Sequence, residues 1–256
     1  MKKLSLTAIF ILLFSNLFFG QNNRDSLFTK IGFPAEIKSE VLGDNVKIFI
    51  HLPFSYNPQK EYPLILLLDA HSSFKSFAGC TELMAYANTI PFSIVVGFPQ
   101  YSYEPANKSE FEPKMEKLMA FCEKELMPYL LSKFNITKTI IWGQGLSGAM
   151  STYFMLNKPG LFNGYISDMP DVSYLPEKTG SKTVFDDIRG KNISYYIFGK
   201  STLPETNNSA AFLRNLQETA KDEFNWHYIV EDEPNMIIRV LTNYMHALEL
   251  FLNEKK

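Results

Sequence analysis

Short hydrophobic runs alternate with amphipathic stretches along most of this chain. The runs bounded by turn residues are typical of strands buried on both faces; they are PLILLLD at 63–69, SIVVGF at 93–98, KTIIW at 138–142 and ISYYIF at 193–198. Weaker alternation predicts further strands at 36–42, 45–52, 161–167 and 226–230. Apolar positions at helical spacing predict helices over 77–89, 113–134, 149–156, 210–221 and 236–252.

The order of these elements predicts an α/β fold. A strand pair joined at Gly43-Asp44 comes first, and strands and helices then alternate to the end. Such alternation indicates a mostly parallel sheet with helices on both faces, and it places ligands at the carboxyl ends of the strands. No internal repeat or long linker divides the chain, so we expect one domain over 21–256.

The first twenty residues are expected to be a secretory signal. Lys2 and Lys3 precede an apolar run over 4–19, which is shorter than the roughly 20 residues that span a bilayer. The alternative is an uncleaved membrane anchor. Because no second long apolar run follows, we expect no membrane span in the mature chain. Its expected location is periplasmic or extracellular.

Composition excludes several classes of function. With 46% hydrophobic and 20% charged residues the chain is not disordered, and a net charge of −2 gives no basic footprint for nucleic acid. The chain has two cysteines and four histidines, too few cysteines for a four-cysteine zinc site. We infer no metal site and no cofactor. Cys80 and Cys122 form either a disulfide or two buried thiols.

The glycine-rich turn at 143–148 follows a predicted strand and opens a helix. As G-x-G-x-x-G (Gly143, Gly145, Gly148) it suggests dinucleotide binding, with Asp168 twenty residues further on for a ribose hydroxyl. As a nucleophile elbow, G-x-S-x-G, it fails at the reacting position, because Gly145 replaces the serine and Ser147 replaces the second glycine. A tightly packed strand–helix junction is the third interpretation.

Several further segments resemble the putative-esterase family of α/β-hydrolases, which includes esterase D-like enzymes, S-formylglutathione hydrolases and siderophore trilactone esterases. The similar segments are IFIHLP at 48–53, YPLILLLD at 62–69, PFSIVVGFP at 91–99, FCEKELMPYLLSKF at 121–134, IIWGQGLSG at 140–148, PGLFNGYI at 159–166 and the closing stretch 231–252. The resemblance implies an α/β-hydrolase fold. It also implies ester hydrolysis by a serine nucleophile and a histidine base, oriented in most members by an acid.

The resemblance places glycine and asparagine where this chemistry needs serine and histidine. Gly145 occupies the serine slot, and Asn235, after the last strand, occupies the histidine slot. No acid follows the preceding strand within 199–202, and Glu205 lies too far along. We therefore expect an inactive member that acts as a binding or accessory protein. Its partner is a small ester or carboxylate ligand or another protein.

An active esterase with displaced residues is the alternative hypothesis. Ser147 and His71 are its candidate nucleophile and base, and His71 follows the strand that ends at residue 69. The remaining histidines lie within predicted strands or the last helix: His51, His227 and His246. The resemblance also assigns an oxyanion-hole and cleft role to Ala70, His71, Gln144 and Leu146.

Overall fold

The computed structural model describes residues 31–68, 70–98, 104–176, 188–199, 208–219 and 224–253. Two compact units divide the chain, Met1–Ile31 and Gly32–Lys256, and the second contains every element described below. The signal expected at 1–20 therefore lies outside the described residues, as do Asp69 and Glu205.

Eight strands of the second unit form one sheet in the order β1-β2-β4-β3-β5-β6-β7-β8. They are β1 (Phe33–Ser39), β2 (Asp44–His51), β3 (Tyr62–Leu67), β4 (Ile94–Gly97), β5 (Ile136–Gln144), β6 (Gly164–Asp168), β7 (Ser194–Gly199) and β8 (Asn225–Val230). β2 pairs antiparallel with β1 and β4, and all other pairs are parallel. The β3, β4 and β7 strands are buried throughout, as continuous apolar runs require.

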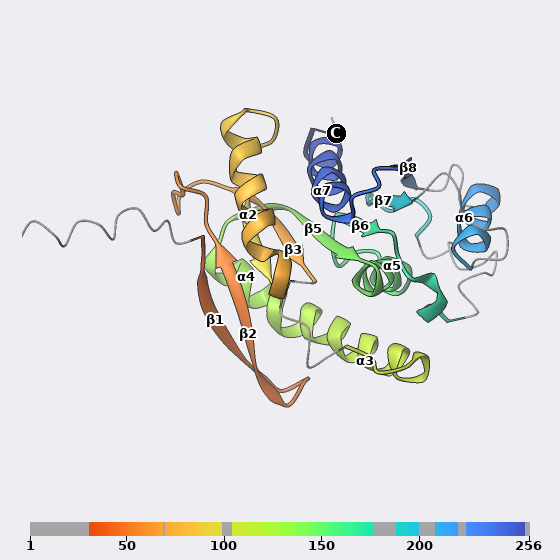
Figure 1. Ribbon diagram of the computed structural model, residues 1–256. Coiled ribbons are helices and arrows are strands. Elements are labelled where there is room, and N and C mark those ends of the chain that lie inside the picture. Colours follow the sequence, from red (N-terminus) through yellow and green to blue (C-terminus); the bar gives the residue numbers. More distant parts are fainter. Residues whose placement is uncertain are drawn as a thin grey trace, which may run out of the picture. The chain divides into compact units, whose positions relative to one another are not determined.

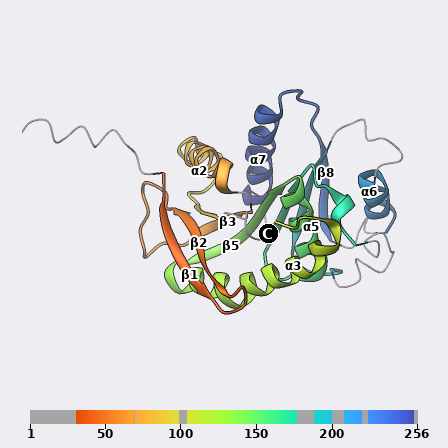
Figure 2. The ribbon, with the colours of Figure 1, turned by 60° about the horizontal axis from the view of Figure 1, so that its bottom comes forward.

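Helices cover both faces of this sheet. They are α2 (Ala70–Tyr86), α3 (Lys108–Phe121), the π-helical turn η3 (Cys122–Leu126), α4 (Met127–Lys133), α5 (Leu146–Asn157), the 3₁₀ turn η4 (Val172–Tyr174), α6 (Asn208–Thr219) and α7 (Met236–Asn253). α2 and α7 pack on one face, and α3, α4 and α5 lie on the other (Figures 1 and 2). The α/β fold predicted from the sequence is confirmed.

Four helices, α2, α3, α5 and α6, begin earlier than predicted, and the shift is largest for α2 and α3. α2 begins at Ala70. Its first residues are mostly polar, so the helical spacing was not apparent, but Phe74, Phe77 and Ala78 are buried along one face of the helix. α3 begins at Lys108, because the side chain of Asn107 accepts the Glu110 N–H at 3.2 Å and caps the helix. The predicted start at Pro113 is wrong, because this proline lies inside the helix.

Aromatic packing holds the carboxyl end of β5. The Trp142 ring meets Phe77 of α2 edge-on at 5.7 Å and Tyr244 of α7 edge-on at 5.2 Å between ring centroids. Tyr244 stacks on Phe77 at 4.3 Å, and its hydroxyl hydrogen-bonds the Thr81 hydroxyl at 2.7 Å. All of these rings are buried. The residue just before the glycine-rich turn is therefore fixed by two helices.

A buried hydroxyl network fixes α5 on the opposite face. Thr152 donates to the Gly148 carbonyl at 3.0 Å. Its hydroxyl also lies 3.0 Å from Ser167 Oγ on β6 and 2.9 Å from the Tyr195 hydroxyl on β7. The helix that follows the glycine-rich turn is thereby tied to two central strands.

Both cysteines are free thiols, which answers the question that the sequence left open. Cys122 is buried and Cys80 half-buried, and burial raises the pKa of each thiol. Among the described residues, no helix combines the length and hydrophobicity needed to cross a bilayer.

Candidate active site

Gly145 stands at the apex of a sharp turn between β5 and α5. Its backbone has φ 57° and ψ −116°, a conformation that residues other than glycine adopt only under strain. Its N–H donates to the Asp168 carbonyl at 2.9 Å, and its own carbonyl accepts the Asp171 N–H at 2.9 Å and the Ala149 N–H at 3.0 Å. This is the strained strand-to-helix turn that presents a nucleophile in α/β-hydrolases, here without a side chain.

The other glycines of the turn are needed for close packing. A Cβ on Gly143 would lie 2.0 Å from the Ser147 carbonyl oxygen, and one on Gly148 would lie 3.1 Å from the Asp168 carbonyl oxygen. A Cβ on Gly145 would meet nothing within 4 Å. The turn thus excludes a side chain at Gly143, crowds one at Gly148 and leaves open space at Gly145.

The backbone amides expected to form an oxyanion hole belong to Leu146, directly after Gly145, and to Ala70, at the start of α2. Leu146 is the first residue of α5, so the helix supplies no partner for its N–H. Ala70 is buried, and its N–H lies 3.4 Å from the Phe98 carbonyl oxygen, a long hydrogen bond. Gln144, the last residue of β5, is half-buried. Leu146 is therefore the best-placed donor for an anionic oxygen.

The proposed substitute residues lie in different environments. Ser147 is in the first turn of α5 and its residue is only 2% exposed. His71 is exposed in the first turn of α2, rather than in a loop as its sequence context predicts. A buried hydroxyl has no access to an ester carbonyl, so this arrangement does not favour Ser147 as a nucleophile.

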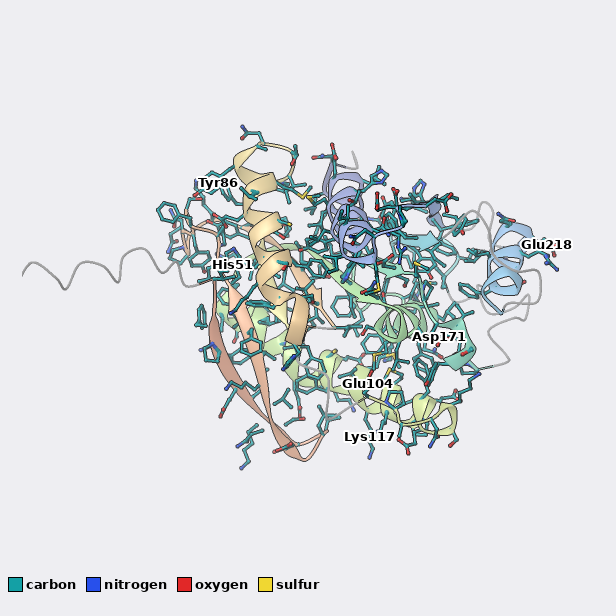
Figure 3. All side chains as sticks on the ribbon, in the orientation of Figure 1. His51, Tyr86, Glu104, Lys117, Asp171 and Glu218 are labelled. Atoms are coloured by element: carbon teal, nitrogen blue, oxygen red, sulfur yellow. The ribbon has the colours of Figure 1, made fainter. Side chains whose placement is uncertain are left out.

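The remaining histidines are engaged elsewhere. His51 Nε2 lies 3.0 Å from Glu82 Oε2, beside α2 and away from Asp171 (Figure 3). His227 Nε2 lies 3.0 Å from the side-chain oxygen of Asn225, and its ring stacks on Tyr196. His246, on α7, packs edge-on against Phe198 at 6.1 Å. The base position that the sequence resemblance expects after β8 falls on Asn235.

Asn235 caps α7. Its side-chain oxygen accepts the N–H groups of Ile237 at 3.0 Å and Ile238 at 3.3 Å, and its own N–H donates to Glu233 Oε1 at 2.9 Å. The residue is exposed. Asparagine is among the best N-cap residues, so its presence here has a structural explanation.

We expect the Asn235→Ala variant to lose about 1 kcal/mol of unfolding free energy, because two N–H groups of α7 lose their acceptor. Asn235→Asp, which keeps an acceptor oxygen beside the helix N-terminus, should match the wild type. Urea unfolding followed by circular dichroism measures both. Equal losses in the two variants would contradict the capping role.

A buried polar cluster lies next to the elbow. We define the Asp168 cluster as Asp168 at the end of β6 with Arg239 and Asn243 of α7, whose residues are 0%, 6% and 1% exposed. Asn243 Nδ2 donates to Asp168 Oδ1 at 2.7 Å, and Arg239 Nη1 donates to the Glu233 carbonyl at 3.1 Å. Burial raises the pKa of Asp168 to about 6, although the Asn243 hydrogen bond and the Arg239 charge oppose this shift.

The raised pKa of Asp168 predicts a pH-dependent stability. Between its ordinary pKa of 3.8 and about 6, the folded state holds the proton more tightly than the unfolded chain. Proton binding by Asp168 therefore stabilises the folded state fully below pH 3.8, and this contribution is lost as the pH rises through 6. The change is about 3 kcal/mol, at 1.36 kcal/mol per pKa unit. The wild-type advantage over Asp168→Asn in urea unfolding should therefore shrink by about this amount from pH 3 to pH 7. A difference independent of pH would contradict it.

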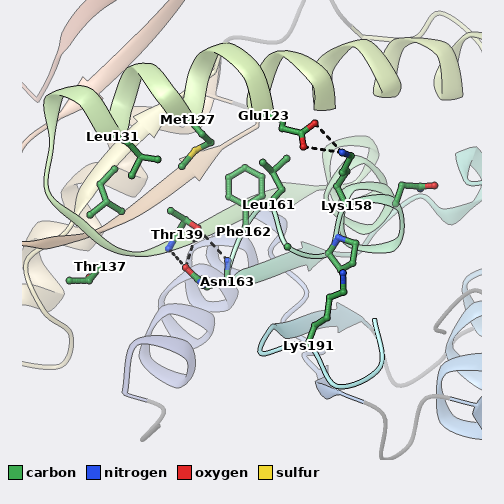
Figure 4. Close-up of a pocket in the computed structure, with 14 residues that line it drawn as sticks. Glu123, Met127, Leu131, Thr137, Thr139, Lys158, Leu161, Phe162, Asn163 and Lys191 are labelled. Carbon is green, nitrogen blue, oxygen red and sulfur yellow. Dashed lines mark hydrogen bonds and ion pairs between the residues drawn. The ribbon is translucent and has the colours of Figure 1, made fainter. Parts of the chain in front are cut away.

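A separate open groove of about 860 Å³ lies at the other end of the sheet (Figure 4). Thr137 and Thr139, near the start of β5, line it together with Asn163, just before β6. Lys158 and Glu123 form an ion pair at its rim, at 2.9 Å. Because it borders the amino ends of the strands, it is not part of the elbow.

Within the described ranges, no group of three or more His, Cys, Asp or Glu side chains could hold a metal ion.

A family model confirms what the elbow geometry indicates. Residues 39–187, more than half of the chain, match the family described as Putative esterase. The chain belongs to this family. The matched region contains the elbow but ends before Asn235 and α7. No curated protein sequence matches the chain.

Solved structures share the fold at low sequence identity. An uncharacterised protein from Capnocytophaga ochracea is 20% identical with a TM-score of 0.73; the match covers 86% of this chain but only 63% of that one. An IroE-like serine hydrolase from Shewanella oneidensis is 17% identical (TM-score 0.69; 86% and 80% covered). The BES protein from Bacillus cereus is 17% identical (TM-score 0.70; 89% and 98% covered). These likenesses show an α/β-hydrolase-like fold.

The esterase fold leaves the dinucleotide interpretation without support. Gly143 and Gly148 are explained by backbone packing within the elbow rather than by the approach of a pyrophosphate. The sequence analysis did not predict the roles of Arg239 and Asn243. The pattern that could have indicated them is a pair of polar residues spaced i, i+4 on the buried face of α7.

Proposed function

We propose that this chain is a non-hydrolytic member of the Putative esterase family that binds small esters or carboxylates at its elbow. The observation that carries the proposal is Gly145, which keeps the strained backbone of a nucleophile position, with φ 57° and ψ −116°, and has no nucleophile. Asn235 stands at the base position and is committed to capping α7.

The size of the catalytic loss supports binding over turnover. Removing the serine or the histidine alone from a triad of this kind costs on the order of 10⁶ in turnover. Here both positions lack the required group. A residual acceleration of roughly 10³ to 10⁴ over water can come from binding and an oxyanion hole alone. Such a rate is too low for an enzyme that works by the usual esterase mechanism.

The groups that remain suit an oxygen with negative charge. The Leu146 N–H lies at the start of the 12-residue helix α5, where the helix dipole and unpaired N–H groups favour anions. The space next to Gly145 gives room for a group that a serine side chain would otherwise contact. A carboxylate, or the carbonyl oxygen of an ester, fits both features.

Binding is tested by titrating ¹⁵N-labelled protein with acetate and following backbone amides. We expect a saturable shift of the Leu146 signal and none at Gly160, which lines the groove at the other end of the sheet. The Leu146→Pro variant removes this N–H at the first helical position, where proline is tolerated, and should lose the response. An unresponsive Leu146 amide in the wild type would end the proposal.

We also propose that the protein is exported, on the charged start and apolar run over 1–20. Expression of the full chain with its leader, followed by intact mass measurement of the product, tests this. Loss of about the first twenty residues supports export, and a full-length cytosolic product contradicts it.

A further inference from the structure

The Asp168 cluster holds three polar atoms that lack hydrogen-bond partners within the part of the chain that the structure describes. They are Asp168 Oδ2, Asn243 Oδ1 and Arg239 Nε, and each has almost no contact with solvent. Buried polar atoms are nearly always paired, because an unpaired one costs about 1–3 kcal/mol. Three such atoms on side chains in mutual contact or electrostatic interaction indicate a position that a further polar group completes.

The chemistry of the three atoms limits what that group can be. Arg239 Nε–H is a donor, Asn243 Oδ1 is an acceptor, and Asp168 Oδ2 is an acceptor when ionised. Asp168 and Arg239 together carry no net charge. A carboxylate would satisfy Arg239 but face the Asp168 oxygen, and an ammonium group would face the guanidinium. A hydroxyl is neutral and both accepts and donates, so a single atom can accept the Arg239 Nε–H and donate its one proton to Asp168 Oδ2, which pairs the two charged members of the set.

Backbone contacts connect the Asp168 cluster to the elbow. The Gly145 N–H donates to the Asp168 carbonyl at 2.9 Å, and Gln144 and Asp168 are register partners in the paired strands β5 and β6. Arg239, the most exposed member at 6%, lies in the first turn of α7, close to Asn235 at the base position.

We propose that Asp168, Asn243 and Arg239 form a hydroxyl-binding subsite of the elbow. The ligand class is then a hydroxylated carboxylate or its ester: the acidic or ester oxygen lies at the Leu146 amide and the hydroxyl lies in the Asp168 cluster. This inference rests on the proposed function, because it names the class of ligand bound at the same site.

Three probes of equal carbon number separate the two proposals. The ¹⁵N-labelled wild-type protein is titrated with acetate, ethylene glycol and glycolate, following the Leu146 amide and the Arg239 Nε–H signal. We expect acetate to move only Leu146, ethylene glycol to move only Arg239, and glycolate to move both at lower concentration. The Nε–H of Arg214, which is exposed on α6, is the matched control and should not respond.

Each outcome decides one proposal. An Arg239 Nε–H that responds to neither hydroxyl probe, with Leu146 still responding to acetate, leaves the proposed function standing and overturns the subsite. An Arg239 signal that follows acetate as strongly as ethylene glycol marks an anion site, which also overturns it. A Leu146 amide that responds to no probe, with Arg239 responding to ethylene glycol, leaves hydroxyl binding in place but removes the proposed carboxylate function.

Two variants with the same chemical change test the carboxylate of the cluster. Asp168→Asn should weaken ethylene glycol binding about tenfold, because a hydrogen bond to a charged acceptor is lost. Asp171→Asn changes an exposed aspartate next to the elbow and should leave the affinity unchanged. Equal affinities in both variants would contradict the role of Asp168. If Asp168→Asn does not fold, the three wild-type titrations still decide.

Discussion

We expect the Gly143→Ala variant to lose about 3 kcal/mol or more of unfolding free energy. The added Cβ would lie 2.0 Å from the carbonyl oxygen and 2.3 Å from the carbonyl carbon of Ser147, and both are backbone atoms of α5. A flexible side chain could move aside, but this backbone is held by the turn and by the hydroxyl network of Thr152. Urea unfolding monitored by circular dichroism measures the loss.

The same substitution at other glycines provides graded controls. Gly145→Ala should cost about 1–3 kcal/mol, because its Cβ has space but the backbone has positive φ. Gly160→Ala, where a Cβ meets nothing within 4 Å and no positive φ is required, should be close to neutral. A Gly143→Ala variant as stable as Gly160→Ala would show that the turn relaxes easily, and the close-packed elbow described above would be wrong.

We expect the Gly145→Ser/Asn235→His double variant to hydrolyse p-nitrophenyl acetate on the order of 100-fold faster than the wild type. Either missing triad member costs on the order of 10⁶, so each single variant should stay near the wild-type rate. The full rate is not expected, because the histidine also replaces the α7 cap and Ser147 stands where the motif has a second glycine.

The matched control for this gain is Gly145→Ala/Asn235→His. It has the same Cβ, the same backbone strain and the same histidine, but no hydroxyl. The control should show no gain in hydrolysis and no labelling by a fluorophosphonate probe. Equal rates in the two double variants would mean that Gly145 is not at the nucleophile position.

The fully buried strands could be predicted from the sequence because strands buried on both faces form continuous apolar runs. The runs at 63–69 and 193–198 became β3 and β7 with ends shifted by a few residues. The start of α2 could not be predicted, because Ala70–Tyr86 opens with polar residues and only the sheet explains why Phe74 and Phe77 are buried. Tertiary packing decided that helix, not its local pattern.

The elbow was also readable from the sequence, whereas its polar surroundings were not. Gly143, Gly145 and Ser147 occupy the first, third and fifth positions of the G-x-S-x-G motif, so their spacing alone aligned them with the esterase turn. The Asp168 cluster depends on a contact between residues 75 apart in the chain, Asp168 and Asn243. No local pattern predicts such a contact, because it arises from the packing of α7 on β6.

The most direct test of the central claim is to treat the full wild-type protein with a fluorophosphonate probe and measure its intact mass. Because Gly145 has no side chain to react, the proposed function predicts an unchanged mass under conditions that label an active serine esterase to completion. A stoichiometric mass gain that is abolished by Ser147→Ala would show that the protein carries an activated serine, and would contradict the account.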